Sequence, residues 1–285
     1  MSTPLHWPAP AKLNLFLHVL GRRADGYHDL QTLFQFLDYG DELSFAVRQD
    51  GRITRPEGPT GVPAEQDLVV RAASALKAAS GSNLGAEIRV IKRTPMGAGL
   101  GGGSSDAATT LVALNYLWGT GLSTHELAAL GVQLGADVPV FVHGNAAWAE
   151  GVGERLTPVT LPEPWYAVLV PDAQVATAAI FKAPSLPRAH APITFDDYLH
   201  GAGINDCAPV TCALYPAVAE ALAWLSRAAP ARMSGTGSAV FASFADERAA
   251  RAAIAGIPPD WQGFVARGLN RSPLAARLAE VSGGR

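Results

Sequence analysis

A chain of 285 residues is long for one hydrophobic core and predicts two packed domains. With 48% apolar and 16% charged residues, the composition is that of a globular protein and leaves little room for disorder. A formal net charge of -3 gives no bulk attraction to nucleic acid or to an anionic membrane, so neither is expected as a partner.

Segments with membrane or redox roles are not expected. No apolar run of about 18 residues occurs, and no basic stretch followed by an apolar run opens the chain. The two cysteines, Cys207 and Cys212, lack a usual metal or redox spacing. The sequence therefore predicts a cytoplasmic protein. Lysine occurs only at positions 12, 77, 92 and 182, which makes each lysine worth examining.

The first half predicts alternating strands and helices. From 11 to 19, Leu13 and Leu15 alternate with Lys12 and Asn14, the period-two pattern of a strand. Further strands are expected at 32–37, 42–47 and 87–91, and a helix at 67–79. A glycine-rich stretch, 95–103, precedes a second helix that ends near residue 118. A third helix begins at the capping-box pair Ser123 and Glu126 and ends near residue 135.

The second half predicts a ferredoxin-like order of elements. Strands are expected at 165–170, 232–234, 239–244 and 263–267, with helices at 214–226 and 246–255. This β-α-β-β-α-β order is the ferredoxin-like pattern, here with an insertion at about 171–211. Glycine and proline cluster at 153–164, which divides the chain into domains at 1–155 and 156–285.

The glycine-rich stretch is the sharpest chemical signal. Glycines just ahead of a helix leave backbone N–H groups free beside the positive end of the helix dipole, where a triphosphate fits. The hydroxyls of Ser104 and Ser105, which follow the stretch directly, add donors. The candidate ATP-binding residues are Pro95, Met96, Gly97, Ala98, Gly99, Leu100, Gly101, Gly102, Gly103, Ser104 and Ser105.

Other phosphate-binding loops fit this stretch less well. A P-loop has lysine where Gly103 stands. A dinucleotide fold needs a strand about 20 residues on, where this sequence predicts another helix. A protein kinase needs His-Arg-Asp and Asp-Phe-Gly sequences, which do not follow. The structural alternative is a flexible glycine connector.

Three separated motifs resemble those of the GHMP kinases, the galacto-, homoserine, mevalonate and phosphomevalonate kinases. Residues 95–107 resemble their central ATP-binding motif, 11–15 their first motif and 234–238 their third. The sequences at 10–15, 22–28 and 134–139 are similar to those of the members that phosphorylate a cytidine diphosphate ester of methylerythritol.

The resemblance implies a fold and a reaction. The expected fold is α+β in two domains: a ribosomal-protein-like β-α ATP-binding domain and a ferredoxin-like substrate domain, with the active site in the cleft between them. The implied reaction transfers the ATP γ-phosphoryl group to the 2-hydroxyl of 4-diphosphocytidyl-2-C-methyl-D-erythritol, in non-mevalonate isoprenoid precursor synthesis. Mg²⁺ is expected with the nucleotide; Ser104 and Ser105 are candidate ligands, and no histidine spacing indicates a metal site. Monomer and homodimer both stay open.

The resemblance also assigns roles to the catalytic candidates. Asp137 is implied as the catalytic base, with helix N-cap as its structural alternative. Lys12 is implied to stabilise the Asp137 carboxylate and the charge on the phosphoryl group, with a surface lysine as the alternative. Asn14 would orient Lys12 or the substrate.

The substrate candidates come from three other segments. Tyr27 would stack on the cytosine and His28 would hydrogen-bond it, while Phe181 is either the opposing stacking partner or a core residue. Gly235 and Thr236 face phosphate or substrate, or merely form a hairpin turn.

Two other functions remain as alternatives. A homoserine or mevalonate kinase would share the glycine-rich motif but not the sequences at 10–15 and 22–28. A non-catalytic nucleotide-binding regulator would have no need for Lys12 and Asp137 together.

Overall fold

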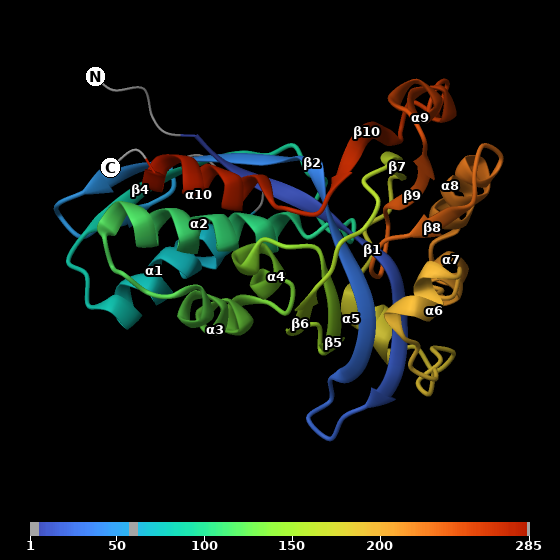
Figure 1. Cartoon of the computed structure of the whole chain (residues 1–285), viewed down its shortest axis with the longest axis horizontal. Coiled ribbons are helices and arrows are strands. Elements are labelled where there is room, and N and C mark those ends of the chain that lie inside the picture. Colours follow the sequence, from blue (N-terminus) through green and yellow to red (C-terminus); the bar gives the residue numbers. More distant parts are fainter. Residues whose placement is uncertain (1–5, 57–61, 284–285) are drawn as a thin grey trace.

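The computed structural model describes residues 6–56 and 62–283. Two lobes lie at opposite ends of a long sheet, and strands β1 and β2 run from one lobe into the other (Figure 1). The expectation that no basic stretch followed by an apolar run opens the chain rests partly on Met1–Leu5. These five residues lie outside the described residues. None of the described helices is both long and apolar enough to cross a bilayer.

The first lobe combines antiparallel strands with a cluster of helices. Its core is built from Trp7, Phe36, Leu111 and Phe141, between the sheet and the helices. Its elements are β1 (His6–Arg22), β2 (His28–Arg48), β3 (Ile53–Thr54), a 3₁₀ turn (Ala64–Gln66), α1 (Leu68–Ser80), β4 (Gly85–Ile91), α2 (Gly102–Trp118), α3 (Thr124–Leu134), α4 (Val138–His143), β5 (Ala147–Gly151) and β6 (Arg155–Pro158).

The second lobe confirms the predicted β-α-β-β-α-β order. Its elements are β7 (Trp165–Val170), α5 (Thr177–Lys182), α6 (Phe195–Leu199), α7 (Ala208–Leu214), α8 (Pro216–Ser226), β8 (Ala231–Met233), β9 (Val240–Phe244), α9 (Glu247–Ala253), β10 (Gln262–Leu269) and α10 (Pro273–Gly283). The strand order β10-β7-β9-β8 is that of a ferredoxin-like sheet. Helices α5 to α7 come from the insertion, and Pro216 separates α7 from α8.

The prediction of two strands at 32–37 and 42–47 was wrong, since both belong to the single strand β2. No turn forms between them because residue 40 lies directly against β1. A Cβ atom at Gly40 would come 2.2 Å from the Ala9 carbonyl oxygen, so only glycine lets the two backbones approach. The long strand pairs with β1, β4, β5 and β10 and so connects the two lobes.

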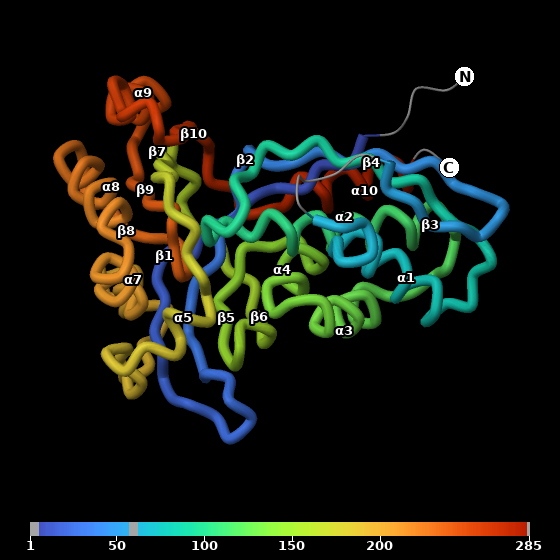
Figure 2. Tube along the Cα trace, turned by 180° about the vertical axis from the view of Figure 1, so that it is seen from behind, coloured from blue at the N-terminus to red at the C-terminus, as the bar shows by residue number. Residues whose placement is uncertain are grey.

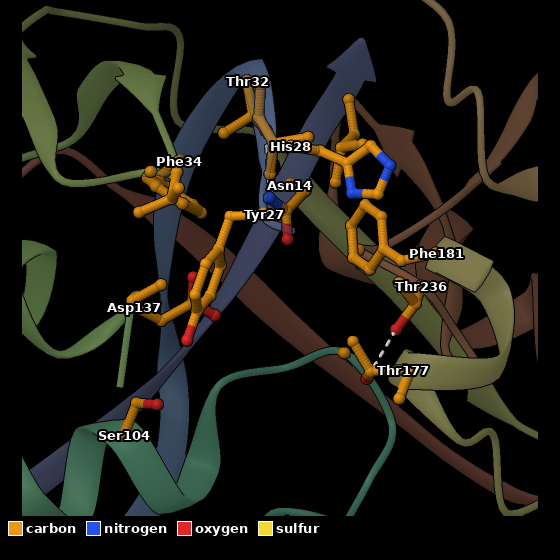
Figure 3. Close-up of a pocket in the computed structure, with 18 of the residues that line it drawn as sticks. Asn14, Tyr27, His28, Thr32, Phe34, Ser104, Asp137, Thr177, Phe181 and Thr236 are labelled. Atoms are coloured by element: carbon orange, nitrogen blue, oxygen red, sulfur yellow. Dashed lines mark hydrogen bonds between the residues drawn. The ribbon is translucent and has the colours of Figure 1, made fainter. Parts of the chain in front are cut away.

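Strand β1 is buried on both faces around Lys12 and Asn14, so its alternation of apolar and polar residues does not mark a solvent-exposed face. Register shifts occur between Pro10 and Lys12 and between Asn14 and Leu17. Such bulges redirect side chains locally. They flank the two polar residues of the first motif, which both point into the space between the lobes (Figure 3 shows Asn14).

The last helix, α10, was missed by the sequence analysis. Leu274, Leu278 and Val281 have helical spacing after Ser272-Pro273, which was the available signal. The helix lies along the first lobe beside α2 and β1, as both views show (Figures 1 and 2). The final segment of the predicted second domain thus packs on the first lobe. The boundary at residue 155 stays a prediction.

Leu274 anchors this helix, and replacing it should destabilise the protein. Its side chain is 1% exposed, so Leu274→Ala leaves a cavity and should lower the free energy of unfolding by about 2–5 kcal/mol. Leu214→Ala is the matched control: that leucine is 54% exposed, and its change should stay within about 0.5 kcal/mol. Urea denaturation measures both. Equal losses in the two variants would mean that α10 does not contribute to the core.

Candidate active site

A cavity of about 590 Å³ lies between the two lobes. Its size is within the range of small-molecule sites. The close-up shows the labelled side chains arranged around this space (Figure 3). Predicted site residues that line it are Lys12, Asn14, Tyr27, His28, Gly99, Ser104, Asp137, Phe181, Gly235 and Thr236.

The ammonium group of Lys12 is held at the bottom of this cavity. Its Nζ lies 3.2 Å from Asp137 Oδ2, donates to the Gly99 carbonyl at 3.1 Å and also donates to Asn14 Oδ1. Lys12 is 2% exposed, so the surface-lysine alternative was wrong. A charge this deeply buried is stable only when it is paired and hydrogen-bonded.

Asn14 is fixed by the same network. Its Nδ2 donates to Thr32 Oγ1 at 2.9 Å, which leaves Oδ1 to accept from Lys12. Its backbone N–H donates to Ser234 Oγ at 3.1 Å, and the Ser234 hydroxyl donates to the Gly99 carbonyl at 2.8 Å. Thr32, not singled out from the sequence, and Ser234, the first residue of the third motif, thereby join β1 and β2 to the glycine stretches at 95–103 and 234–238.

Asp137 occupies the N-cap position of α4, yet its carboxylate makes no capping hydrogen bond. One third of the side chain is exposed, on the cavity side of Lys12. The carboxylate is therefore available to a ligand. Its proline neighbour, Pro139, occupies the first turn as expected.

The glycine stretch bends sharply before α2. Gly97, Gly99 and Gly101 all have positive φ, the region that favours glycine, whereas Ala98 does not. A Cβ atom at Gly99 would meet the Ser234 carbonyl oxygen at 2.2 Å, and one at Gly101 would meet Phe141 and Lys12. The loop is thus packed against the Lys12 network, which a flexible connector would not be.

A second cavity, of about 370 Å³, is lined by every predicted ATP-binding residue except Ser105. It adjoins the first, since Gly99 and Ser104 line both. Ser105 is fully buried, and its Oγ has no hydrogen-bond partner. The N-terminus of α2, with its free N–H groups, opens into this second space.

The three aromatic candidates surround the far end of the first cavity. Tyr27, in the turn between β1 and β2, is 63% exposed. His28 begins β2 and stacks on Phe181 of α5, with ring centroids 5.2 Å apart at 25°. Phe181 also packs on the second-lobe core, as its structural alternative requires, while its role as a stacking partner for a base stays a prediction. In Figure 3 the Tyr27 ring lies toward Asp137, while His28 and Phe181 lie together across the cavity.

Comparison with known proteins places these observations in a family. The GHMP kinases N terminal domain model matches residues 67–145, and the GHMP kinases C terminal model matches 188–260. A relative from Alkalilimnicola ehrlichii, 4-diphosphocytidyl-2-C-methyl-D-erythritol kinase, is 60% identical over 98% of this chain and 96% of its own length. The chain belongs to the GHMP kinase family. The resemblance seen in the sequence is thereby confirmed.

Further relatives of the same kind support the assignment. The Nitrosococcus oceani protein with the same name is 59% identical over 95% of this chain and 96% of its own length. A crystal structure of 4-(cytidine 5'-diphospho)-2C-methyl-D-erythritol kinase is 35% identical, with a TM-score of 0.81 over 93% of this chain and 99% of that one. Methanococcus jannaschii mevalonate kinase, at 14% identity and a TM-score of 0.69, shares the fold alone. The predicted two-domain α+β GHMP kinase fold is confirmed.

Residues outside the recognised motifs also line the GHMP kinase cavities. Thr177 of α5 lies 3.0 Å from Thr236, hydroxyl to hydroxyl, across the cavity floor (Figure 3). Gly235 has positive φ, as its turn requires. Lys182 and Arg188, from the insertion, line the same cavity. No sequence signal marks Thr177 or Arg188, because the insertion matched none of the three motifs.

A cluster of three charges borders the second cavity and was also missed. The Lys92 ammonium donates to Asp41 and, at 2.8 Å, to Asp106 Oδ2. Asp41 Oδ1 accepts from the backbone N–H groups of Arg93 and Thr94 at 2.6 and 2.7 Å. Asp106 Oδ1 is buried without a partner. The rarity of lysine in the sequence was the available signal for Lys92.

Titration of Asp106 should make stability fall as pH rises. Burial raises the pKa of Asp106 from 3.8 to about 7, against the opposing charge of Lys92. Between pH 3.8 and pH about 7, Asp106 holds a proton in the folded protein that it releases in the unfolded chain. The stability from this proton is therefore complete below pH about 4 and is lost as pH rises through about 7.

Asp106→Asn should prevent this pH-dependent loss of stability, because the amide does not ionise. The free energy of unfolding of the variant minus that of the wild type should increase between pH about 5 and about 8, measured by urea denaturation. Asp260→Asn, an exposed aspartate, is the control and should show no such trend. A constant difference for Asp106→Asn would mean that its carboxyl ionises normally.

Proposed function

We propose that this chain transfers the γ-phosphoryl group of ATP to the 2-hydroxyl of 4-diphosphocytidyl-2-C-methyl-D-erythritol, a step of non-mevalonate isoprenoid precursor synthesis. One observation carries the proposal: the Lys12–Asp137 pair lies where the glycine-loop cavity meets a cavity with aromatic walls. The names and high identities of the relatives supply the substrate.

The geometry suits transfer between two separately held ligands. A triphosphate in the glycine loop would direct its terminal phosphoryl group past Ser104 toward the shared boundary of the two cavities. An acceptor alcohol in the larger cavity would approach Asp137 from the other side. Because little covalent chemistry is required of a kinase, this positioning supplies much of the catalysis.

Asp137 is the proposed general base. As the hydroxyl oxygen forms its bond to γ-phosphorus, the hydroxyl proton passes to the Asp137 carboxylate and the bond to the β-phosphate oxygen breaks, which releases ADP. The buried Lys12 charge lies 3.2 Å from that carboxylate and stabilises the negative charge on the transferring group. Asn14 and the Gly99 carbonyl hold the ammonium in this place.

The larger cavity is the proposed substrate site. Tyr27 and Phe181 would supply aromatic faces for the cytosine, and His28 a hydrogen bond to its edge. Gly235 and Thr236 line the same cavity, where they would face the phosphates of the ester. The aromatic residues would thus hold the end of the substrate that does not react.

Mg²⁺ is the proposed companion of the nucleotide. Among the described residues, no group of three His, Cys, Asp or Glu side chains is arranged to hold a metal ion. Ser104 lines both cavities, whereas Ser105, whose Oγ has no partner, is fully buried and lines neither. The Ser104 hydroxyl therefore fits an ion held mainly by phosphates and water, which would neutralise charge on the triphosphate.

Location and assembly complete the proposal. We infer a cytoplasmic enzyme because the two cysteines are unpaired thiols, Cys207 buried within the second-lobe core. Every group named in the proposed reaction comes from one chain, so either a monomer or a homodimer would hold a full site.

An acceptor panel tests the reaction. ADP release is measured with the cytidyl diphosphate ester, homoserine and mevalonate as alcohols, each at equal concentration with ATP and Mg²⁺. The ester alone should give rapid turnover. Preference for homoserine or mevalonate would favour the other branch of the family, and nucleotide binding without ADP release from any acceptor would favour a regulator.

Removing either member of the catalytic pair should lower kcat. Asp137→Asn should reduce kcat by roughly 10²–10⁴ because the amide does not accept the proton. Lys12→Ala should reduce it by roughly 10²–10³, with a smaller effect on the KM for ATP. Asp260→Asn serves as the control for an exposed carboxylate and should turn over normally. A near-normal kcat for Asp137→Asn would mean that Asp137 is not the catalytic base and has only a structural place at the N-terminus of α4.

Truncating Phe181 should weaken substrate binding selectively. Loss of one stacking face is worth about 1–3 kcal/mol, so Phe181→Ala should raise the KM for the ester roughly 5- to 150-fold. The KM for ATP should stay constant because the nucleotide occupies the other cavity. Phe244→Ala, which removes a half-buried ring elsewhere on the same core, controls for lost packing. A parallel change in both Michaelis constants would assign Phe181 to the core.

A further inference from the structure

The guanidinium of Arg188 joins two walls of the larger cavity. Its Nε–H donates to His28 Nε2 at 3.2 Å, and its Nη2 donates to the Phe181 and Ala183 carbonyls at 3.0 and 2.7 Å. Its Nη1 donates to the Leu186 carbonyl at 3.1 Å. His28 and Arg188 are 160 residues apart in the sequence, so this contact exists only in the folded protein.

The contacts with Phe181 and Ala183 stabilise the end of α5. Helix α5 ends at Lys182, and the last carbonyls of a helix have no partner within it. A cationic side chain that donates to them satisfies the carbonyls and matches the negative end of the helix dipole. Arg188 therefore fixes the turn that carries the Phe181 ring, while the same planar group holds the imidazole stacked on that ring.

The contact with His28 determines which imidazole nitrogen carries the proton. Arginine Nε has one hydrogen and no lone pair to offer, so His28 Nε2 must accept. A neutral imidazole then carries its proton on Nδ1. Burial, followed by the charges of Arg188 and Arg22, lowers the pKa of His28 and keeps the ring neutral. Nδ1 is the ring nitrogen left for a ligand, and it is a donor.

The segment that carries Arg188 is itself anchored to β1. The His190 backbone N–H donates to the Val19 carbonyl at 3.1 Å, and His190 Nδ1 lies 2.9 Å from Asp206 Oδ1. The His190 ring also stacks on buried His18, with centroids 3.6 Å apart. The backbone at residue 190, two residues after Arg188, is thus held beside β1, the strand that leads to the Tyr27–His28 turn.

We propose that Arg188 is a positioning residue for substrate recognition: it locks His28 in the Nδ1–H tautomer and holds the ring against Phe181. His28 thereby presents a donor to an acceptor atom on the edge of the substrate base. This inference rests on the proposed function for the identity of the ligand. Lysine would not replace Arg188, because only the guanidinium donates from Nε and Nη2 within one rigid plane.

Nitrogen NMR of the histidines tests the tautomer without substrate. The full-length protein is labelled with ¹⁵N-histidine, and two-bond correlations of the His28 ring, assigned with a His28→Asn variant, report which nitrogen is protonated. The wild type should show the Nδ1–H form. Arg188→Met and Arg188→Lys should both lose it, because neither side chain has an Nε–H at this position.

Arg22→Met is the matched control. Arg22 also lines the cavity and also lowers the pKa of His28, but it acts there through its charge. Its removal should raise the pKa of His28 and leave the Nδ1–H tautomer in place. The control thus separates the specific hydrogen bond from the local positive potential.

Steady-state kinetics then test the consequence. Both Arg188 variants should raise the KM for the cytidyl diphosphate ester roughly 10-fold, the worth of about one oriented hydrogen bond, with kcat and the KM for ATP nearly unchanged. An unaltered tautomer, or an altered tautomer with an unchanged KM for the ester, would overturn the proposal. So would unfolding of Arg188→Lys, which keeps the charge. Failure of the wild type to phosphorylate the ester would instead overturn the proposed function, since the tautomer is measured without it.

Discussion

A buried ammonium group organises the centre of this protein. Lys12 is almost fully enclosed, and a charge in that environment is tolerated only if every donor has an acceptor. Its acceptors come from three separate segments: Asn14 on the same strand, the Gly99 carbonyl of the glycine stretch and the carboxylate of Asp137. The position of each segment is therefore coupled to the others through one atom, Nζ.

The constraint extends into the backbone. The Lys12 N–H donates to the Leu100 carbonyl, so the glycine stretch is tied to β1 at two successive carbonyls, those of Gly99 and Leu100. Gly99 and Gly101 approach so closely that any side chain would displace Ser234 or Lys12 itself. In the proposed function the glycines would serve two needs at once, since they would free backbone N–H groups for phosphate and they admit the lysine that would act on it.

The lobes are joined in a way that favours a site between them. Strand β2 runs through both, and Leu17 and Val19 of β1 belong to the core of the second lobe. The last helix returns to the first lobe. The proposed substrate-binding residues on the insertion are consequently connected to the segments that carry the proposed catalytic pair. Arg188 and His190 continue that connection into a segment with little regular structure.

Short-range sequence patterns were sufficient to predict those elements that depend only on neighbouring residues. The capping box at Ser123, the order of the ferredoxin-like elements and the existence of α2 after the glycine stretch all follow from short-range spacing. Local patterns did not show that the segments at 32–37 and 42–47 form one strand, β2. Here Gly40 is required by the backbone of β1, which no local pattern shows.

By itself the sequence determined the family, a candidate phosphate loop and the candidate site residues Lys12, Asp137, Tyr27, His28 and Phe181, since motifs and resemblance are properties of short segments. The tertiary structure alone decided that Lys12 is buried, that Asp137 has a carboxylate free of capping, and that Arg188 reaches His28. Burial, ion pairing and the tautomer of a histidine depend on neighbours more than a hundred residues away. Only the folded chain brings those neighbours together.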